Sequence, residues 1–300
     1  MAALQPEIDA NSVWRKLRWL RFNVRALVIA VAIFCAVLGL WVERARRQKA
    51  ALSELDSFGG GFNYDYDWDQ ETGRCTSGNG QSWVPASILD RTGPDLFHDV
   101  SALSFSNLPY SPYDDGDPPP IDNAVFVTAV KHELRLLRHI RQLDLVATPD
   151  ATAECLPAVR RLTKLELLEC WGATDAGIAN LAGLGRLREV TVYEGRLTDE
   201  SLRVFGKMDR LERLCLLGTN TFTNEGLAHL RRLRRIKQLG LEGIGDGITD
   251  AGLEYLHGFR DMQGLSLPGT FAPDAVARLE AAIPSLPTQG INLVVEAGSK

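Results

Sequence analysis

The sequence lacks the residue patterns that several functional classes require. Its 300 residues hold only five cysteines, which excludes a small domain held together by disulfides. Positive charge is not in excess, because the formal net charge is −5, and this argues against a nucleic-acid-binding protein with a broad basic surface. The chain also contains no GxSxG, HExxH, P-loop or GxGxxG motif, so the commonest hydrolase, metalloprotease and nucleotide-binding signatures are missing.

Charge is distributed unevenly along the chain. Residues 1–50 carry a net charge of +6, residues 51–121 carry −10, and residues 122–300 carry −1. A chain divided in this way has a basic terminal segment, an acidic connecting region and a nearly neutral folded body. Within the basic segment, residues 1–25 form a polar N-terminal tail ahead of an apolar run.

The apolar run at residues 26–42 predicts a transmembrane helix. Its 17 uncharged residues would span roughly 25 Å as a helix, close to the roughly 30 Å hydrocarbon core of a bilayer. Glu43 and Arg44 follow directly, which disfavours a cleaved signal peptide; that alternative and a buried helix of a soluble domain stay open. Five basic residues precede the run and four follow it, which slightly favours a cytoplasmic N-terminus. We therefore expect a single-pass cell-membrane protein that contacts the lipid bilayer here, with an extracytoplasmic C-terminal domain.

Residues 43–121 form an acidic connector and capping region. Aromatic and acidic residues alternate in Phe62–Asp69, which predicts a capping strand. A calcium loop is the alternative, but its sixth position would be Gln70 where such loops need glycine. His98 is interpreted as a hydrogen-bonded structural residue, since no nucleophile motif accompanies it. Residues 109–120 are rich in proline and predict a loop.

Residues 122–288 contain six copies of an apolar-x-apolar pair. The first members of successive pairs are 22, 25, 24, 25 and 26 residues apart. A Thr-Asp or Thr-Asn pair then marks the start of a helix in four units, because threonine caps free amides and aspartate complements the helix dipole. Each unit is therefore a short strand and a short helix, and units must stack to bury their apolar faces. The pairs are Leu143/Leu145, Leu165/Leu167, Val190/Val192, Leu214/Leu216, Leu239/Leu241 and Leu265/Leu267.

These motifs resemble those of leucine-rich repeat proteins. The resemblance rests on LxxLxLxx(T/C) and on ITDAGL at residues 248–253, and Cys170 is similar to the cysteine of one repeat subclass. An apolar anchor ahead of such repeats also resembles a group of bacterial membrane proteins of undefined activity. The resemblance implies an α/β solenoid with short parallel strands on its concave face and short helices on its convex face. Residues 291–295 predict a closing strand within a C-terminal cap at residues 289–300.

The concave face of such a solenoid is the candidate binding surface. No set of residues there combines a nucleophile, a histidine and an acid, or has metal-ligand spacing, so we expect no enzyme, no metal, no cofactor and no nucleic-acid partner. An apolar row edged by polar residues favours an unidentified protein partner. The alternative is that loops after the strands, including Trp171, cover this row and make it core. The candidate residues are Val146, Glu166, Leu168, Thr191, Tyr193, Arg213 and Leu217.

Lysine and arginine recur where each helix returns to the next strand, most densely at Arg231–Lys237. Helix C-termini favour cations, which accounts for this pattern without a ligand. The alternative is an anion-binding edge, with the protein acting as an extracytoplasmic receptor for a polysaccharide or other polyanion. The interpretation favoured by the resemblance is a membrane-anchored, non-catalytic protein-interaction module.

Overall fold

A computed structural model describes residues 24–72, 74–75, 81–105, 123–145, 148–244, 247–287 and 291–295. The chain divides into two compact units, residues 1–46 and 47–300. Helix α2 (Val24–Asp56) begins in the first unit and ends in the second. In the first unit its large apolar side chains, from Leu27 to Trp41, are exposed. The stretch 25–56 is long and apolar enough to cross a membrane, with a mean hydropathy of 2.5 in its most apolar window.

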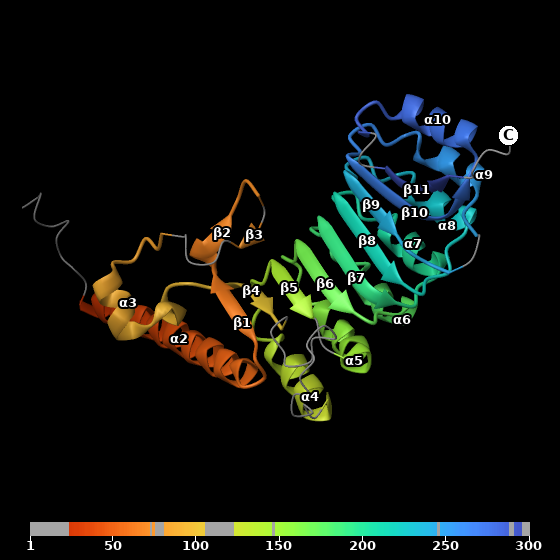
Figure 1. Cartoon of the computed structure of the whole chain (residues 1–300). Coiled ribbons are helices and arrows are strands. Elements are labelled where there is room, and N and C mark those ends of the chain that lie inside the picture. The colour runs from red at the N-terminus through yellow and green to blue at the C-terminus, as the bar shows by residue number, and fades with distance from the viewer. Residues whose placement is uncertain are drawn as a thin grey trace, which may run out of the picture. The chain divides into compact units, whose positions relative to one another are not determined.

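The main sheet in the described part of the second unit has nine strands (Figure 1). Strand order follows the chain from β4 to β11, and all of these strands are parallel to their neighbours. Only β1 runs antiparallel, along the outer side of β4. The strands are β1 (Gly61–Tyr64), β4 (Val100–Ser104), β5 (Gln142–Leu145), β6 (Leu167–Trp171), β7 (Glu189–Gly195), β8 (Arg213–Gly218), β9 (Gln238–Leu241), β10 (Gly264–Phe271) and β11 (Ile291–Val295).

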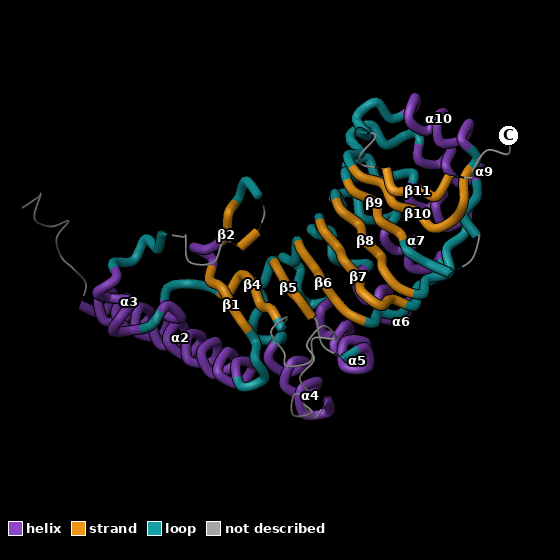
Figure 2. The backbone as a smooth tube through the Cα atoms, viewed as in Figure 1, coloured by secondary structure: helices purple, strands orange, loops and turns teal. Residues whose placement is uncertain are grey.

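Short helices connect successive strands of this sheet and lie together on one of its faces (Figure 2). Strands and helices alternate along the chain, and successive strands are neighbours in the sheet, which confirms the predicted leucine-rich repeat solenoid. The core lies between the two layers, where the inward-pointing Leu143, Leu216 and Leu241 are fully buried. The helices of this layer are α4 (Asn123–Glu133), α5 (Pro149–Val159), α6 (Asp175–Ile178), α7 (Asp199–Phe205), α8 (Asn224–Leu230), α9 (Asp250–Leu253) and α10 (Pro273–Ala282). Helix α3 (Ala86–Thr92) precedes β4 and does not belong to this layer (Figure 1).

The predicted phase of the second repeat is wrong by three residues. Leu168, not Leu165, lies beside Leu143 in the sheet. Leu162, Leu165 and Leu168 are all fully buried, and Leu167 is nearly so, which leaves the sequence with two equally apolar frames. The last four pairs keep their predicted phase in β7, β8, β9 and β10.

The threonines that begin the helices also join neighbouring repeats. Thr198 and Thr223 accept hydrogen bonds from the amides two residues further on, at 3.3 and 3.2 Å, which confirms their capping role. Thr174 and Thr249 stand at the same position before their helices, but their side chains make no capping hydrogen bond, so the prediction is wrong for these two. Asp175, in the repeat before Thr198, accepts from the Thr198 amide at 3.0 Å and hydroxyl at 2.8 Å. Asp199 binds Thr223 in the same way, at 2.9 and 2.6 Å. Each aspartate therefore fixes the start of the next repeat's helix.

The capping region is more broken than its sequence predicts. Phe62–Asp69 forms β1, then a 3-10 turn at Asp65–Asp67, then β2 (Trp68–Asp69), because the Asp65 side chain turns toward His98. Strand β2 pairs with β3 (Arg74–Cys75) as a small separate hairpin. The closing strand is confirmed as β11. The predicted proline-rich loop and N-terminal tail lie outside the described residues.

Candidate functional site

The face of the sheet opposite the helices, here called the open sheet face, carries part of the predicted binding surface. Thr191 and Tyr193 on β7, and Arg213 and Leu217 on β8, alternate with buried core residues and are half-buried. The other predicted residues do not join them. Leu168 points into the core and is fully buried, and Glu166 precedes β6 at the edge of the sheet. Val146 lies outside the described residues.

Trp171 occupies the place on this face that the misphased repeat assigned to Leu168. It is part of β6 rather than of a covering loop, and it pairs with Tyr193 on β7. The two aromatic rings stack with their centroids 5.8 Å apart and their planes 26° from parallel. Leu217 follows Leu216, which pairs with Val192, and it faces the same side of β8 as Arg213. The register of β7 and β8 shifts between Val192 and Gly195, so Leu217 lies near Tyr193 at an irregular part of the sheet. We call Trp171, Tyr193 and Leu217 the aromatic row.

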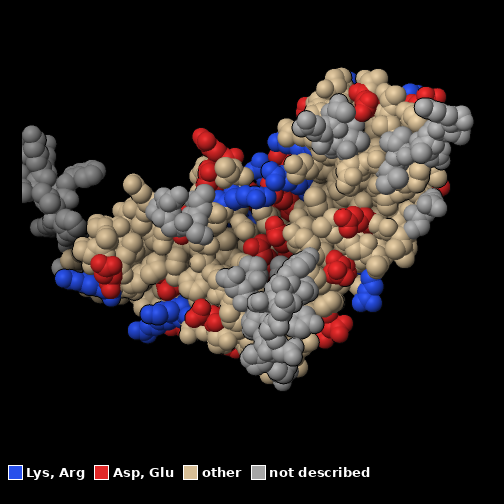
Figure 3. Space-filling model, in the orientation of Figure 1, with Lys and Arg blue, Asp and Glu red and all other residues tan. Residues whose placement is uncertain are grey.

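The β2–β3 hairpin packs on the open sheet face over the first repeats. The Arg74 guanidinium forms an ion pair with the Glu189 carboxylate at 2.7 Å. The Arg141 guanidinium lies 5.3 Å from the centre of the Trp68 ring, within the range of a cation–π contact. Figure 3 shows basic side chains close to the hairpin and to the strand starts, above acidic side chains in the hollow of the sheet. The hairpin was not predicted to reach this face, since its partners are about 70 to 115 residues away in the sequence.

Acidic residues lie on the open sheet face beside the hairpin. Burial raises the pKa of Asp144, and hydrogen bonds from Gln142 and Ser104 offset part of this effect. Burial also raises the pKa of Glu169, and the nearby negative charge of Asp144 raises it further. Arg74 opposes both shifts. Among the described residues, no group of three or more His, Cys, Asp or Glu side chains is placed to hold a metal ion.

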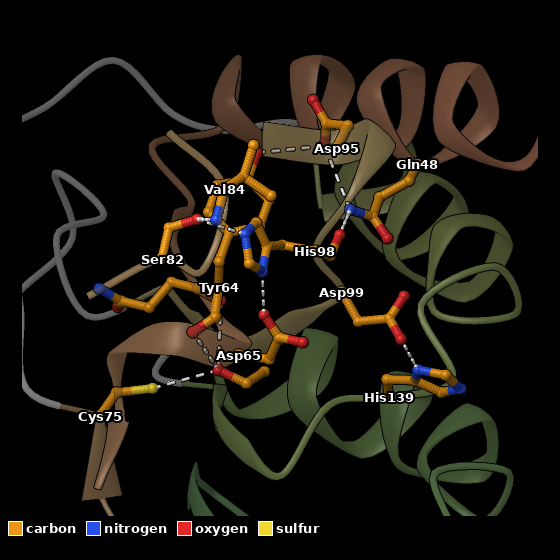
Figure 4. Close-up of polar contacts among 12 residues, drawn as sticks. Gln48, Tyr64, Asp65, Cys75, Ser82, Val84, Asp95, His98, Asp99 and His139 are labelled. Carbon is orange, nitrogen blue, oxygen red and sulfur yellow. Dashed lines mark hydrogen bonds and ion pairs between the residues drawn. The ribbon is translucent and has the colours of Figure 1, made fainter. Parts of the chain in front are cut away.

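His98 lies in a hydrogen-bonded chain with Asp65 and Ser82 (Figure 4). Its Nδ1 lies 2.7 Å from Asp65 Oδ1, and its Nε2 lies 2.8 Å from Ser82 Oγ. A serine, a histidine and an acid in this order also occur in hydrolases. Here the Val84 amide donates to Ser82 Oγ itself at 3.0 Å, so this donor is not directed at a substrate oxyanion. His98 is 2% exposed with Tyr66 packed edge-on against it, and we interpret the chain as a structural link between three segments of the cap.

The buried cysteines are unsuited to nucleophilic chemistry. Burial raises the pKa of the Cys155 and Cys170 thiols to about 12, so both remain protonated at neutral pH. Cys75 and Cys215 are half-buried, and burial raises the pKa of each of them as well. A reactive cysteine needs a lowered pKa together with an accessible sulfur. The pKa of each of these four thiols is raised instead.

No protein-family model matches the sequence, and neither does any curated protein. Among solved structures, the chain is similar to internalin InlF of Listeria monocytogenes, with 15% identity and a TM-score of 0.41 over 55% of this chain and 50% of that one. It is also similar to internalin C2 of the same organism (18% identity, TM-score 0.42, 54% and 65% covered) and to a leucine-rich repeat protein of Leptospira interrogans (15%, 0.33, 54% and 57%). The match therefore spans about half to two thirds of each of these chains. The strand order and register of this chain by themselves identify a leucine-rich repeat solenoid.

Proposed function

We propose that this chain is a membrane-anchored, non-catalytic module that binds another protein on the open sheet face. The aromatic row carries this proposal. Its three side chains project from neighbouring strands, so the backbone hydrogen bonds of the sheet hold them in fixed positions about 4.8 Å apart. Tyrosine and tryptophan on a rigid surface bind partners with little loss of side-chain entropy, and they are frequent hot spots of protein interfaces.

The surroundings of the aromatic row favour a partner that combines an apolar group with a cation. Thr191 and Arg213 provide polar contacts beside the row, and Glu194 and Glu242 add exposed negative charge. The chain's own Arg74 already binds Glu189 on the same face, which shows that a guanidinium fits there. A polar rim around a small apolar centre is the usual anatomy of a protein–protein interface.

Anchoring is the second part of the proposal. Residues 26–42 would hold the module at the cell membrane, and the exposed apolar side chains of helix α2 support this. A monomeric soluble protein rarely exposes a continuous apolar surface of this kind. The repeat domain would then face the extracytoplasmic side, following the slight excess of basic residues before the helix.

Site-specific photo-crosslinking in native membranes tests the binding surface. We expect Leu217→p-benzoylphenylalanine to give one discrete crosslinked protein. The same probe at Arg203, an exposed residue of α7 on the helical face, should give none. Adding Tyr193→Asp to the Leu217 probe should remove the product. Equal products from both probe positions, or a product that persists with Tyr193→Asp, would contradict the proposed surface.

A further inference from the structure

The edge of the sheet where the strands begin carries a ladder of alternating charges. Glu212 binds Arg188 at 2.8 Å on one side and Lys237 at 2.7 Å on the other. Glu166 lies between Arg141 and Arg188, at 3.9 and 4.0 Å. The Arg188 amide donates to the Glu166 carbonyl at 2.8 Å, and similar bonds fix each rung one strand spacing, about 4.8 Å, from the next. We call these five residues the charge ladder.

A second row of arginines runs alongside the charge ladder. Arg186, Arg210 and Arg235 lie two positions before successive ladder residues, and all three are exposed. None of them forms an ion pair with any residue that the structure describes. Glu212 cannot neutralise them, because it is already bound on both sides; burial raises its pKa, but Lys237 and Arg188 outweigh burial and lower it. Three like charges therefore stand side by side, and none of them is paired with an acidic residue in the part of the chain that the structure describes.

The two rows enclose a cavity of about 260 Å³, here called the arginine pocket. This volume lies just below the range of about 300–1000 Å³ typical of sites for larger organic ligands. Its lining contains no apolar side chain, and four arginines against two glutamates leave it with an excess of positive charge. Basic side chains gather at the corresponding strand starts in Figure 3. The lining residues are Glu166, Arg186, Arg188, Arg210, Glu212 and Arg235.

We propose that the arginine pocket binds a soluble anion that carries two or more linked phosphate or sulfate groups. A guanidinium presents a planar fork of donors that matches the oxygen atoms of such groups. Three forks repeated at the rung spacing favour a ligand whose charges are also repeated, because each fork can then bind its own group without the side chains having to converge. The site lies within the predicted basic edge, where arginines recur at each return from helix to strand, but it is not the densest cluster of that edge. Arg235 lines the pocket, whereas Arg231, Arg232 and Arg234 do not.

This inference does not depend on the proposed protein-binding surface. The pocket lies at the starts of the strands, and none of its lining residues belongs to the aromatic row. Loss of protein crosslinking by Tyr193→Asp and loss of anion binding by pocket variants are therefore separable results.

Calorimetric titration of the full-length chain in a non-ionic detergent tests the pocket. The probes are tripolyphosphate, orthophosphate and glycerol 1-phosphate, the last standing for a lipid headgroup. The test variant is Arg186→Gln/Arg210→Gln/Arg235→Gln. The matched control is Arg231→Gln/Arg232→Gln/Arg234→Gln, which removes the same charge from exposed residues of the same edge outside the pocket. Thermal melts of both variants establish that they fold.

We expect tripolyphosphate to bind at least about tenfold more tightly than either single-phosphate probe. The pocket variant should lose at least about tenfold in affinity, and the control should stay within about twofold of the original chain. If the triple variant fails to fold, Arg210→Lys keeps the charge and loses the fork, and should still weaken binding several-fold. Equal losses in the two triple variants would show diffuse attraction to the edge and overturn the proposal. Absence of tripolyphosphate binding, or equal affinity for orthophosphate, would overturn it as well.

Discussion

At the scale of single residues, Asn220 shows how much one buried side chain can organise. It is fully buried after β8, where it accepts a hydrogen bond from the Leu197 amide at 2.9 Å. Its own amide group donates to the carbonyls of Leu216 and Glu242, at 3.2 and 2.8 Å. One asparagine therefore satisfies backbone groups in three successive repeats. Neither the apolar spacing nor the helix-start pairs of the sequence single out this residue.

We predict that Asn220→Ala destabilises the repeat domain by about 2–4 kcal/mol. The substitution removes the partners of the Leu197 amide and the Glu242 carbonyl, whereas the Leu216 carbonyl still accepts from the Glu242 amide at 2.8 Å. Each buried group left unpaired costs about 1–3 kcal/mol before local relaxation. Asn180→Ala is the control, because Asn180 bonds only to its own helical turn. It should cost less than about 0.5 kcal/mol. Chemical denaturation of both variants followed by circular dichroism measures the difference, and similar losses would contradict the bridging role.

A second prediction separates Leu168 from Tyr193. Leu168→Asp should unfold the domain or lower its melting temperature strongly, because a charge would enter a fully buried position. Tyr193→Asp should cost no more than about 1.5 kcal/mol, from the lost stacking on Trp171. Thermal melts of the two variants provide the measurement. If both substitutions were equally mild, the corrected phase of the second repeat would be wrong.

A third prediction concerns two aspartates whose pKa values shift in opposite directions. Burial by itself raises the pKa of Asp175, but hydrogen bonds from Ser201 and Thr198 outweigh it, so the folded-state pKa lies below the ordinary value of 3.8. Asp175 therefore stabilises the fold above that value, and this contribution is lost as the pH falls through the lower folded pKa. The raised pKa of Asp144 means the reverse: its charge costs stability at neutral pH, and the cost disappears in acid.

The corresponding variants are Asp175→Asn and Asp144→Asn. Asp175→Asn should be less stable than the original chain at pH 7, with the difference shrinking below pH 4. Asp144→Asn should be more stable at pH 7, with the gain also shrinking in acid. Denaturation midpoints at pH 7, 5 and 3 measure both trends. A stabilising Asp175→Asn, or a destabilising Asp144→Asn at pH 7, would contradict the assigned shifts.

At the scale of the repeat, the glycine of the helix-start motif has a packing role. A Cβ added to Gly226 would lie 2.0 Å from Asp199 Oδ1, the atom that binds the Thr223 amide. We predict that Gly226→Ala destabilises the domain by about 1–2 kcal/mol, because the overlap costs more than the roughly 1 kcal/mol that alanine gains in a helix. Gly183→Ala, with nothing within 4 Å of the added Cβ, should be neutral or slightly stabilising. Denaturation experiments distinguish the two.

The predictability of the elements follows from how local their causes are. Strands such as β7 and β8 are set by alternation within a few residues, and the sequence places them in the right phase. Leu162, Leu165 and Leu168 offer two apolar frames, and only pairing with Leu143 decides between them. The position of the β2–β3 hairpin on the sheet could not be predicted, for a different reason. Its position depends on contacts such as Arg74 with Glu189, which leave no periodic signal in the sequence.

The candidate site was predicted in part for the same reason. Thr191, Tyr193, Arg213 and Leu217 lie on the open sheet face because their repeats were phased correctly. Trp171 was missed as a member of the aromatic row because its repeat was not. The sequence predicts an anion-binding edge only as an alternative to helix-dipole complementarity, and it does not delimit the arginine pocket within that edge. The pocket forms only when arginines about 25 residues apart are aligned on successive strands. Its excess of positive charge depends also on which carboxylates already form ion pairs, and the sequence does not give these pairs.

At the scale of the whole molecule, the anchor yields the last prediction. The protein should remain in the membrane fraction after carbonate or high-salt washing, because residues 26–42 form an uninterrupted apolar span. Deletion of these residues should release the repeat domain to the soluble fraction. Release of the unaltered chain by washing alone would contradict the anchor. Protease treatment of intact cells then determines the side, since an extracytoplasmic repeat domain should be degraded.

The chain-order arrangement of β4 to β11 also has a consequence for protein synthesis. Every strand after β4 pairs with the one made just before it, roughly 22 to 26 residues earlier in most repeats. The antiparallel strand β1, which closes the first end, is made earlier still. During synthesis each new strand from β5 onward can therefore pair with a strand that is already complete, whereas the β2–β3 hairpin gains its contacts with Arg141 and Glu189 only later. At each stage the last strand made has one edge without a neighbouring strand, until β11 completes the sheet.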